Sequence, residues 1–160
     1  MMNKSPFRSD KICCISDIHI GVHQNGAQWH DIVIEWAQWL HNELINKGIE
    51  DIIIAGDLFH YRDEIAVNTI QVVTEVLKIW KPFNIGILIG NHDSYYKDKV
   101  DVNSCSILSG WDNITIFDKL HKTSESICLG SSTKNYKKIN MYLNTIIFEK
   151  KESKQLKIPK

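Results

Sequence analysis

Three short aliphatic runs, each followed directly by polar residues, constrain the fold of this chain more than any other feature. The runs cover residues 12–15, 52–55 and 85–89. Because they contain no polar position, they predict strands buried on both faces, as in a parallel sheet. Residues 29–47 and 65–80, which lie between the runs, repeat apolar side chains at helical spacing. This alternation predicts an α/β fold, a parallel-type sheet with flanking helices.

The rest of the chain carries weaker signals. A short helix and three more strands are expected at residues 102–109, 114–117, 126–129 and 139–148. The chain has 160 residues, and we expect one domain over residues 1–130, followed by a divergent, Lys-rich segment over residues 131–160. That segment is predicted to be strand-like at first and frayed at its end.

The charged residues are distributed unevenly. Residues 1–130 carry 11 basic and 17 acidic side chains, whereas residues 131–160 carry 8 lysines and 2 glutamates. The net charge of the whole chain is zero, which is not the balance of a protein that coats nucleic acid. Two interpretations of the basic segment stay open, a solvated terminus and a tail that contacts phosphate.

The composition indicates a folded protein of a reducing compartment. Hydrophobic residues make up 43% and charged residues 24% of the chain, which argues against wholesale disorder. The four cysteines form no C-x-x-C pair, so we expect buried thiols rather than a disulfide framework or a zinc ribbon. The aliphatic runs are too short for a signal peptide or a membrane span, so we expect a cytoplasmic protein without a membrane partner.

Polar motifs follow the three predicted strands at the point where each strand ends. They are Asp17-Ile18-His19, Gly56-Asp57-Leu58-Phe59-His60 and Gly90-Asn91-His92-Asp93. The carboxyl ends of parallel strands lie at one edge of a sheet, which is where open α/β sheets bind ligands. We therefore expect these carboxylates, imidazoles and the amide to form one cluster.

The residue types of this cluster indicate a metal site. Oxygen and nitrogen donors without thiolate suit manganese, magnesium, iron or zinc. The two oxygens of Asp57 allow it to bridge two ions, and two ions ~3.5–4 Å apart form the clamp used for displacement at phosphorus. His92 is placed to donate a proton to the leaving oxygen, with Asp93 as a residue that could orient it.

These three motifs resemble the first three motifs of the calcineurin-like metallophosphoesterase superfamily. Within it, residues 16–21 and 56–60 are similar to the SbcD-type nuclease subunits of DNA double-strand-break repair, including their phage recombination counterparts. The resemblance covers about residues 10–120. It implies the N-terminal half of a β-sandwich whose parent fold has four α/β/β/α layers.

The resemblance also implies roles for individual residues. Asp17 and His19 would hold the first metal, Asp57 would bridge both metals, and Asn91 would ligate the second. The family uses two divalent ions, of which manganese is the expected species.

Two histidines would carry the remaining chemistry of the family. His92 would be the general acid, and His60 would help to position the phosphate. The resemblance implies cleavage of DNA phosphodiester bonds in exonuclease and endonuclease modes. It also implies a homodimer and a partnership with an ABC-type ATPase subunit of the SbcC type.

The pattern departs from the family after His92. The family supplies three further histidine ligands there, two of them in a Gly-His-x-His pair, whereas this chain has one later histidine, His121, and no Gly-His dipeptide. We therefore expect an incomplete site in a truncated or split gene product. The alternatives are a non-catalytic remnant that acts through protein or DNA contacts, and a generic phosphatase or phosphodiesterase.

Overall fold

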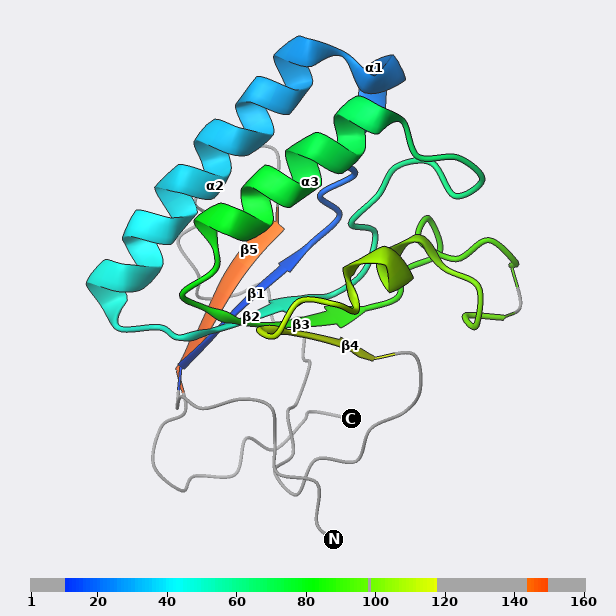
Figure 1. The fold of residues 1–160 in the computed structure, drawn as a ribbon. Helices are drawn as coiled ribbons and strands as arrows, with labels where there is room; N and C mark the ends of the chain where they lie inside the picture. Colours follow the sequence, from blue (N-terminus) through cyan, green and yellow to red (C-terminus); the bar gives the residue numbers. More distant parts are fainter. Residues whose placement is uncertain (1–10, 98, 118–143, 150–160) are drawn as a thin grey trace, which may run out of the picture.

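The structure is a computed structural model that describes residues 11–97, 99–117 and 144–149 (Figure 1). Its elements are β1 (Lys11–Ser16), α1 (Val22–Asn25), α2 (Ala27–Lys47), β2 (Asp51–Ile54), α3 (Val67–Ile79), β3 (Asn84–Leu88), η1 (Ser104–Leu108), β4 (Ile114–Phe117) and β5 (Asn144–Glu149). The three predicted inner strands and both long helices are present, each within about two residues of its expected bounds.

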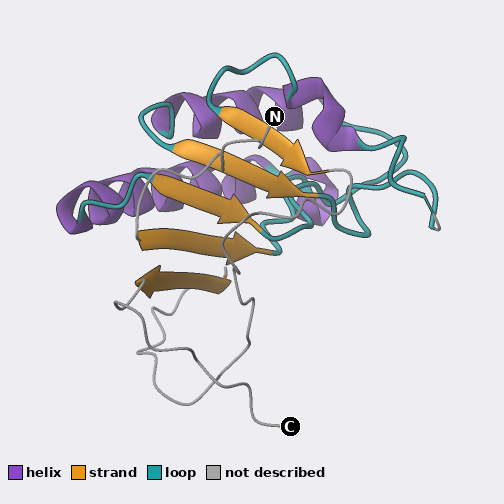
Figure 2. Cartoon of the chain, turned by 90° about the horizontal axis from the view of Figure 1, so that it is seen from below, coloured by secondary structure: helices purple, strands orange, loops and turns teal. Residues whose placement is uncertain are grey.

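The strands form one five-stranded sheet in the order β4-β3-β2-β1-β5. β1 to β4 pair in parallel, and β5 pairs antiparallel with β1 at the edge. The register aligns one row of residues across the whole sheet, Ile147, Cys13, Ile52, Ile85 and Ile114. The predicted α/β fold class is confirmed, with the carboxyl ends of the parallel strands at one edge (Figure 2).

The two long helices lie side by side on one face of the sheet (Figures 1 and 2). Their inner faces bury apolar side chains, among them Leu40 and Leu44 of α2 and Leu77 of α3, against Ile52 and Ile85 of the sheet. Burying one such side chain contributes about 1.5–3 kcal/mol. The packing of α2 and α3 on the sheet therefore holds the three strand ends, and the loops that follow them, in fixed positions.

The residue that follows each long helix is held by a specific contact. α2 ends at Lys47, and Gly48 follows it with a left-handed φ of 62° and an N–H that donates to the carbonyls of Ile45 and Leu44. Glycine adopts this conformation without the steric cost that a Cβ would add. α3 ends at Ile79, and Trp80 follows fully buried, its indole N–H donating to the Ala37 carbonyl of α2 at 3.0 Å.

Several expectations concern segments of weaker signal. The predicted short helix is a 3₁₀ turn, η1, whose start is capped by the Asn103 side chain accepting from Ser106 N. β4 occupies the predicted strand at 114–117, and β5 overlaps the predicted strand at 139–148. The strand expected at 126–129 and His121 lie outside the described residues. No helix in the described part of the chain is long and apolar enough to span a membrane.

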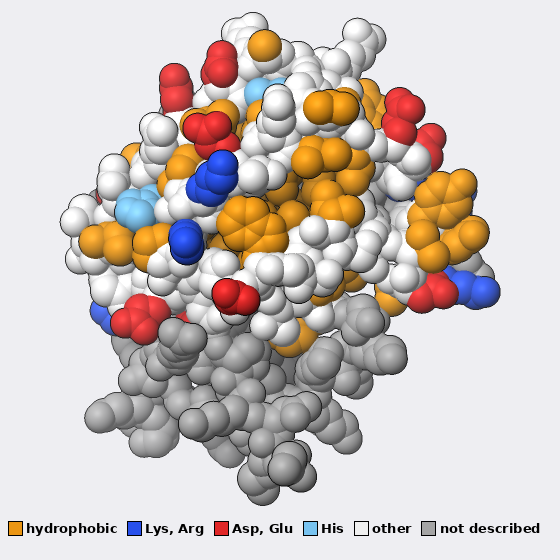
Figure 3. All heavy atoms as spheres, in the orientation of Figure 1, with side chains coloured by type: hydrophobic (Ala, Val, Ile, Leu, Met, Phe, Trp, Pro, Cys, Tyr) orange, Lys and Arg blue, Asp and Glu red, His pale blue; other side chains and the backbone are white. Residues whose placement is uncertain are grey.

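The helical face of the molecule is chemically mixed. Figure 3 shows exposed hydrophobic side chains between charged groups of both signs. Large apolar side chains exposed on α2 and α3 are Ile32, Trp39, Ile45, Val67 and Ile70. Because charges of both signs are mixed on this face, it does not form a surface that would attract anions.

We expect two buried cysteines to resist alkylation in the native protein. Burial, with a contribution from Cys14, raises the pKa of Cys13 to about 12, and burial with the nearby Asp93 also raises the pKa of Cys105. Because the thiolate is the reactive form, both thiols are almost entirely protonated at pH 8. Mass spectrometry after iodoacetamide treatment should find both residues unlabelled until urea is added, and rapid native labelling would contradict their burial.

Candidate active site

The loops after β1 and β2 continue side by side beyond the end of the sheet. His19 N donates to Asp57 O and Ile20 N to Leu58 O, each at 2.9 Å, and Ile20 forms an isolated parallel bridge with Phe59. The loop after β3 joins them, because His92 N donates to Asp57 Oδ1 at 2.9 Å. The structure therefore brings residues of all three sequence motifs to one edge of the sheet.

Three residues at this edge have a left-handed backbone conformation. Asp17, His19 and Asp57 have φ values of 56°, 48° and 54°. Aspartate and histidine reach this region more readily than most residues, but it is still costly, about 1–3 kcal/mol each. Such strain persists where the surrounding structure enforces it, and it clusters at functional sites.

Asp17, His19 and Asp57 form the first potential metal-ligating group, which we call the carboxylate group. His19 Nε2 lies 3.8 Å from Asp17 Oδ1 and 3.9 Å from Asp57 Oδ2. These separations are too long for hydrogen bonds, but they suit ligands around an ion whose own bonds are ~2.0–2.2 Å long. The donor set of two carboxylates and one imidazole fits a divalent ion.

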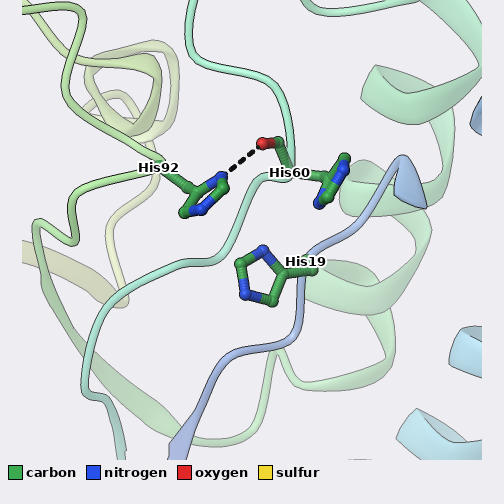
Figure 4. A group of neighbouring side chains, drawn as sticks. All are labelled: His19, His60 and His92. Carbon is green, nitrogen blue, oxygen red and sulfur yellow. Dashed lines mark hydrogen bonds between the residues drawn. The ribbon is translucent and has the colours of Figure 1, made fainter.

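His19, His60 and His92 form the second group, which we call the imidazole group (Figure 4). The ring of His19 lies edge-on to the other two, with centroids 5.4 Å from His60 and 4.7 Å from His92. His92 Nδ1 lies 2.7 Å from the backbone carbonyl of His60. A carbonyl only accepts, so Nδ1 of His92 carries a proton and Nε2 remains for another partner.

Two nitrogens of the imidazole group are buried without a hydrogen-bond partner among the described residues. They are Nδ1 of His19 and Nδ1 of His60. Burial, followed by the neighbouring His19, His92 and His23, lowers the pKa of His60, so its ring stays neutral more readily. Buried polar atoms without a hydrogen-bond partner are uncommon in folded proteins. These two nitrogens are atoms that a bound ion would use as ligands.

Asp93 is fully buried and binds backbone rather than the histidine next to it. Its carboxylate accepts from Phe59 N at 2.9 Å, from Gly90 N at 2.9 Å and from Leu58 N at 3.3 Å. The sequence suggested Asp93 as a residue that could orient His92, whereas in the structure Nδ1 of His92 contacts the His60 carbonyl. Asp93 instead ties the loop after β2 to the loop after β3.

Asn91 lies in the loop after β3, where its exposed side chain lines a groove of about 500 Å³. The described residues lining this groove include three basic side chains and no acidic one: Arg62, Ile89, Gly90, Asn91, Ser94, Tyr96, Lys97, Lys99 and Val100. Ser94 Oγ bonds the Tyr96 carbonyl at 2.7 Å and Tyr95 N donates to Val102 O at 2.9 Å, which closes the loop that carries the lysines. The groove therefore places positive charge beside the two metal-ligating groups.

Residues 10–154 match the family model described as calcineurin-like phosphoesterase. The chain belongs to the calcineurin-like phosphoesterase family. This family is metal-dependent, and the two groups of ligands at the strand ends are where this chain could hold metal.

One solved structure similar to this family member is the crystal structure of Pseudomonas putida nuclease MPE. The two are 22% identical, and the match covers 71% of this chain and 50% of the other, with a TM-score of 0.46. The chain thus spans half the length of that nuclease. A comparison with curated proteins finds no match.

Sequence patterns predicted the residues that the structure brings together at this edge but missed the contacts that support them. The clamp made by Asp93 and the acceptor role of the His60 carbonyl depend on backbone contacts between separate loops, which no motif encodes. The basic groove had a visible signal, since Arg62 follows the second motif and Lys97 follows the third. The sequence alone does not show that these basic residues line one groove, because that depends on how the two loops fold.

Gly90 gives a direct test of how tightly this candidate site is packed. A Cβ at residue 90 would overlap the backbone nitrogen and the carboxylate of Asp57. We expect Gly90→Ala to destabilise the protein by about 1–3 kcal/mol, the usual range for overpacking, and to weaken manganese binding by displacing Asp57. Gly110→Ala is the matched control, because its added Cβ meets no atom within 4 Å among the described residues beyond its two chain neighbours. Equal urea midpoints for both variants would contradict this packing.

Proposed function

We propose that this chain carries the metal site of a phosphodiesterase that cleaves DNA. The observation that carries the proposal is the carboxylate group, in which Asp17, His19 and Asp57 converge at the strand ends of a calcineurin-like phosphoesterase. Asp17 and His19 would hold a first divalent ion, and Asn91 would hold a second divalent ion. Asp57 would bind both ions. Bound ions of this kind activate water and neutralise charge that develops on phosphate.

The remaining side chains of the edge would handle the substrate. His92 has its Nδ1–H committed to the His60 carbonyl, which fixes the ring and leaves Nε2 for the leaving oxygen. In the protonated imidazole Nε2 donates a proton as the phosphorus–oxygen bond breaks. His60, whose ring lies 5.6 Å from that of His92, would help to hold the phosphate.

The basic groove supports a polymeric substrate over a small monoester. A monoester carries a single phosphate, which the metal site alone can bind. Arg62, Lys97 and Lys99 line a groove that runs from Asn91, and they would meet the phosphates that flank the cleaved bond. Tyr96 in the same groove offers an exposed ring on which a base could stack.

We expect the double variant Arg62→Ala/Lys97→Ala to lose DNA cleavage selectively. Removing two phosphate contacts should raise the KM for DNA by about tenfold or more and reduce the slope of log KM against log salt by about two. Hydrolysis of bis(p-nitrophenyl) phosphate, which is too small to reach the groove, should stay unchanged. Lys78→Ala/Lys81→Ala is the matched control, since both lysines are exposed near the end of α3.

The assay of the 160-residue chain itself tests the proposal. Manganese-dependent cleavage of single- or double-stranded DNA would support it. Release of phosphate from monoesters without DNA cleavage would favour a generic phosphatase, and no turnover with any divalent metal would favour a non-catalytic chain. The proposal extends to manganese as the working ion, to a homodimer and to an ABC-type ATPase partner, which copurification with such a subunit would test.

A further inference from the structure

The carboxylate group and the imidazole group share one residue, His19. Within each group, the ligand atoms lie within 4.8 Å of one another. A neutral imidazole carries a proton on one ring nitrogen and a lone pair on the other, so His19 can bind one ion at a time and ions in the two groups would compete for it. The function proposed above uses the carboxylate group as metal ligands and leaves His60 and His92 free for the substrate.

The two groups differ in the metal that they favour. The carboxylate group offers two charged oxygens and one nitrogen, a set that suits manganese or magnesium. The imidazole group offers three neutral nitrogens and no oxygen, a set that suits zinc, cobalt or nickel. Three histidines with a fourth position left for water is also a known arrangement for a zinc ion.

We propose that the imidazole group is a separate metal position that takes a borderline divalent ion such as zinc, in competition with the carboxylate group. Zinc–nitrogen bonds are ~2.0–2.1 Å long, so tetrahedral ligands lie roughly 3.3 Å apart. The three imidazoles would have to approach by about 1.5 Å at most, a change that side-chain torsions can provide because all three rings are half-exposed.

Two further observations point to a ligand here. His92 donates its Nδ1–H to the His60 carbonyl, which is the outer contact that metal-binding histidines usually make. His19 and His60 each bury a nitrogen with no hydrogen-bond partner in the described part of the chain. The first contact fixes a tautomer suited to coordination through Nε2, and the second leaves donors that an ion would satisfy.

The consequence for activity rests on the proposed function. An ion in the imidazole group would occupy His92, the proposed proton donor, and would withdraw His19 from the carboxylate group. Zinc should therefore inhibit hydrolysis that manganese supports, and excess manganese should relieve the inhibition.

Cobalt(II) is the probe that separates the two positions without measuring turnover. A tetrahedral site rich in nitrogen gives intense visible absorption, whereas an octahedral oxygen-rich site absorbs weakly. We expect the wild-type chain to develop intense bands that zinc bleaches. His60→Gln should weaken this cobalt binding at least tenfold and lose the bands, and Asp17→Asn should keep them.

The variants are chosen so that folding does not decide the outcome. His60→Gln retains the backbone carbonyl that binds His92, and Asp17 is half-exposed, so asparagine adds no clash. His41→Gln is the control for adventitious imidazole binding, because His41 lies on α2 and bonds Ile79 O. Circular dichroism should give the same spectrum for all three variants.

Each result has a definite meaning. Bands that survive in His60→Gln and vanish in Asp17→Asn, or weak octahedral bands alone, would overturn the inference. Manganese-dependent DNA cleavage together with such bands would leave the proposed function standing. Bands that depend on His60 in a chain without hydrolytic activity would support the inference and refute the function.

Discussion

Replacing Asp57 with asparagine is expected to remove manganese binding and metal-dependent hydrolysis together. One carboxylate oxygen faces His19 Nε2 at 3.9 Å and the other accepts from His92 N at 2.9 Å, so this residue joins both metal-ligating groups. Asparagine keeps the volume but removes the charge. A loss of about 4 kcal/mol of transition-state stabilisation corresponds to a fall of about a thousandfold in kcat/KM.

The measurement pairs calorimetry with the DNA assay. Manganese affinity of Asp57→Asn should drop by about a hundredfold, and its circular dichroism should match that of the wild type. Asp63→Asn is the matched control, because Asp63 is exposed just beyond the second motif and should change neither quantity. Unchanged manganese binding in Asp57→Asn would show that the chain's metal is held elsewhere.

Replacing Asp93 with asparagine is expected to cost the most stability of any single change at this edge. Its fully buried carboxylate accepts from three backbone N–H groups on two loops. Asparagine turns one of its two acceptor atoms into an N–H donor, which would face at least one of those N–H groups. Losing a hydrogen bond to a charged group costs ~1.5–3 kcal/mol, so about 3 kcal/mol is expected here.

Urea denaturation measures this loss directly. Asp93→Asn should lower the unfolding midpoint with an unchanged slope, and Asp112→Asn, on an exposed turn before β4, should leave it as it is. Manganese binding should also weaken, because the loops that carry Asp57 and His92 lose their tie. If the urea midpoint of Asp93→Asn equals that of the wild type, these hydrogen bonds make no net contribution to the free energy of unfolding.

The fold followed from local patterns because each pattern was strong and unambiguous. Residues 52–55 contain no polar side chain, and β2 is indeed buried along its whole length in the centre of the sheet. The same reasoning placed the strand before each motif, and so it predicted that Asp17, Asp57 and His92 would meet. Parallel strands ending at one edge turn separations of tens of residues into neighbouring positions.

What could not be predicted depends on contacts between loops. The left-handed backbone of Asp57 could not be predicted, because nothing in the sequence distinguishes it from an aspartate in an ordinary turn. The partners of the Asp93 carboxylate are amides of residues 34 and 35 positions away in the chain, along with one amide of its own loop. Backbone amides leave no signature in an amino-acid sequence.

The row of paired residues that crosses the sheet limits where insertions and deletions can occur in such a chain. The site depends on the number of residues between that row and each motif, because one inserted residue in a strand would move a ligand by ~3.3 Å and turn it to the opposite face. The turns that join α2 and α3 to the strands that follow them carry no such constraint. Insertions and deletions should therefore accumulate around α2 and α3, while the few residues that separate Cys13 from Asp17, or Ile52 from Asp57, keep their number.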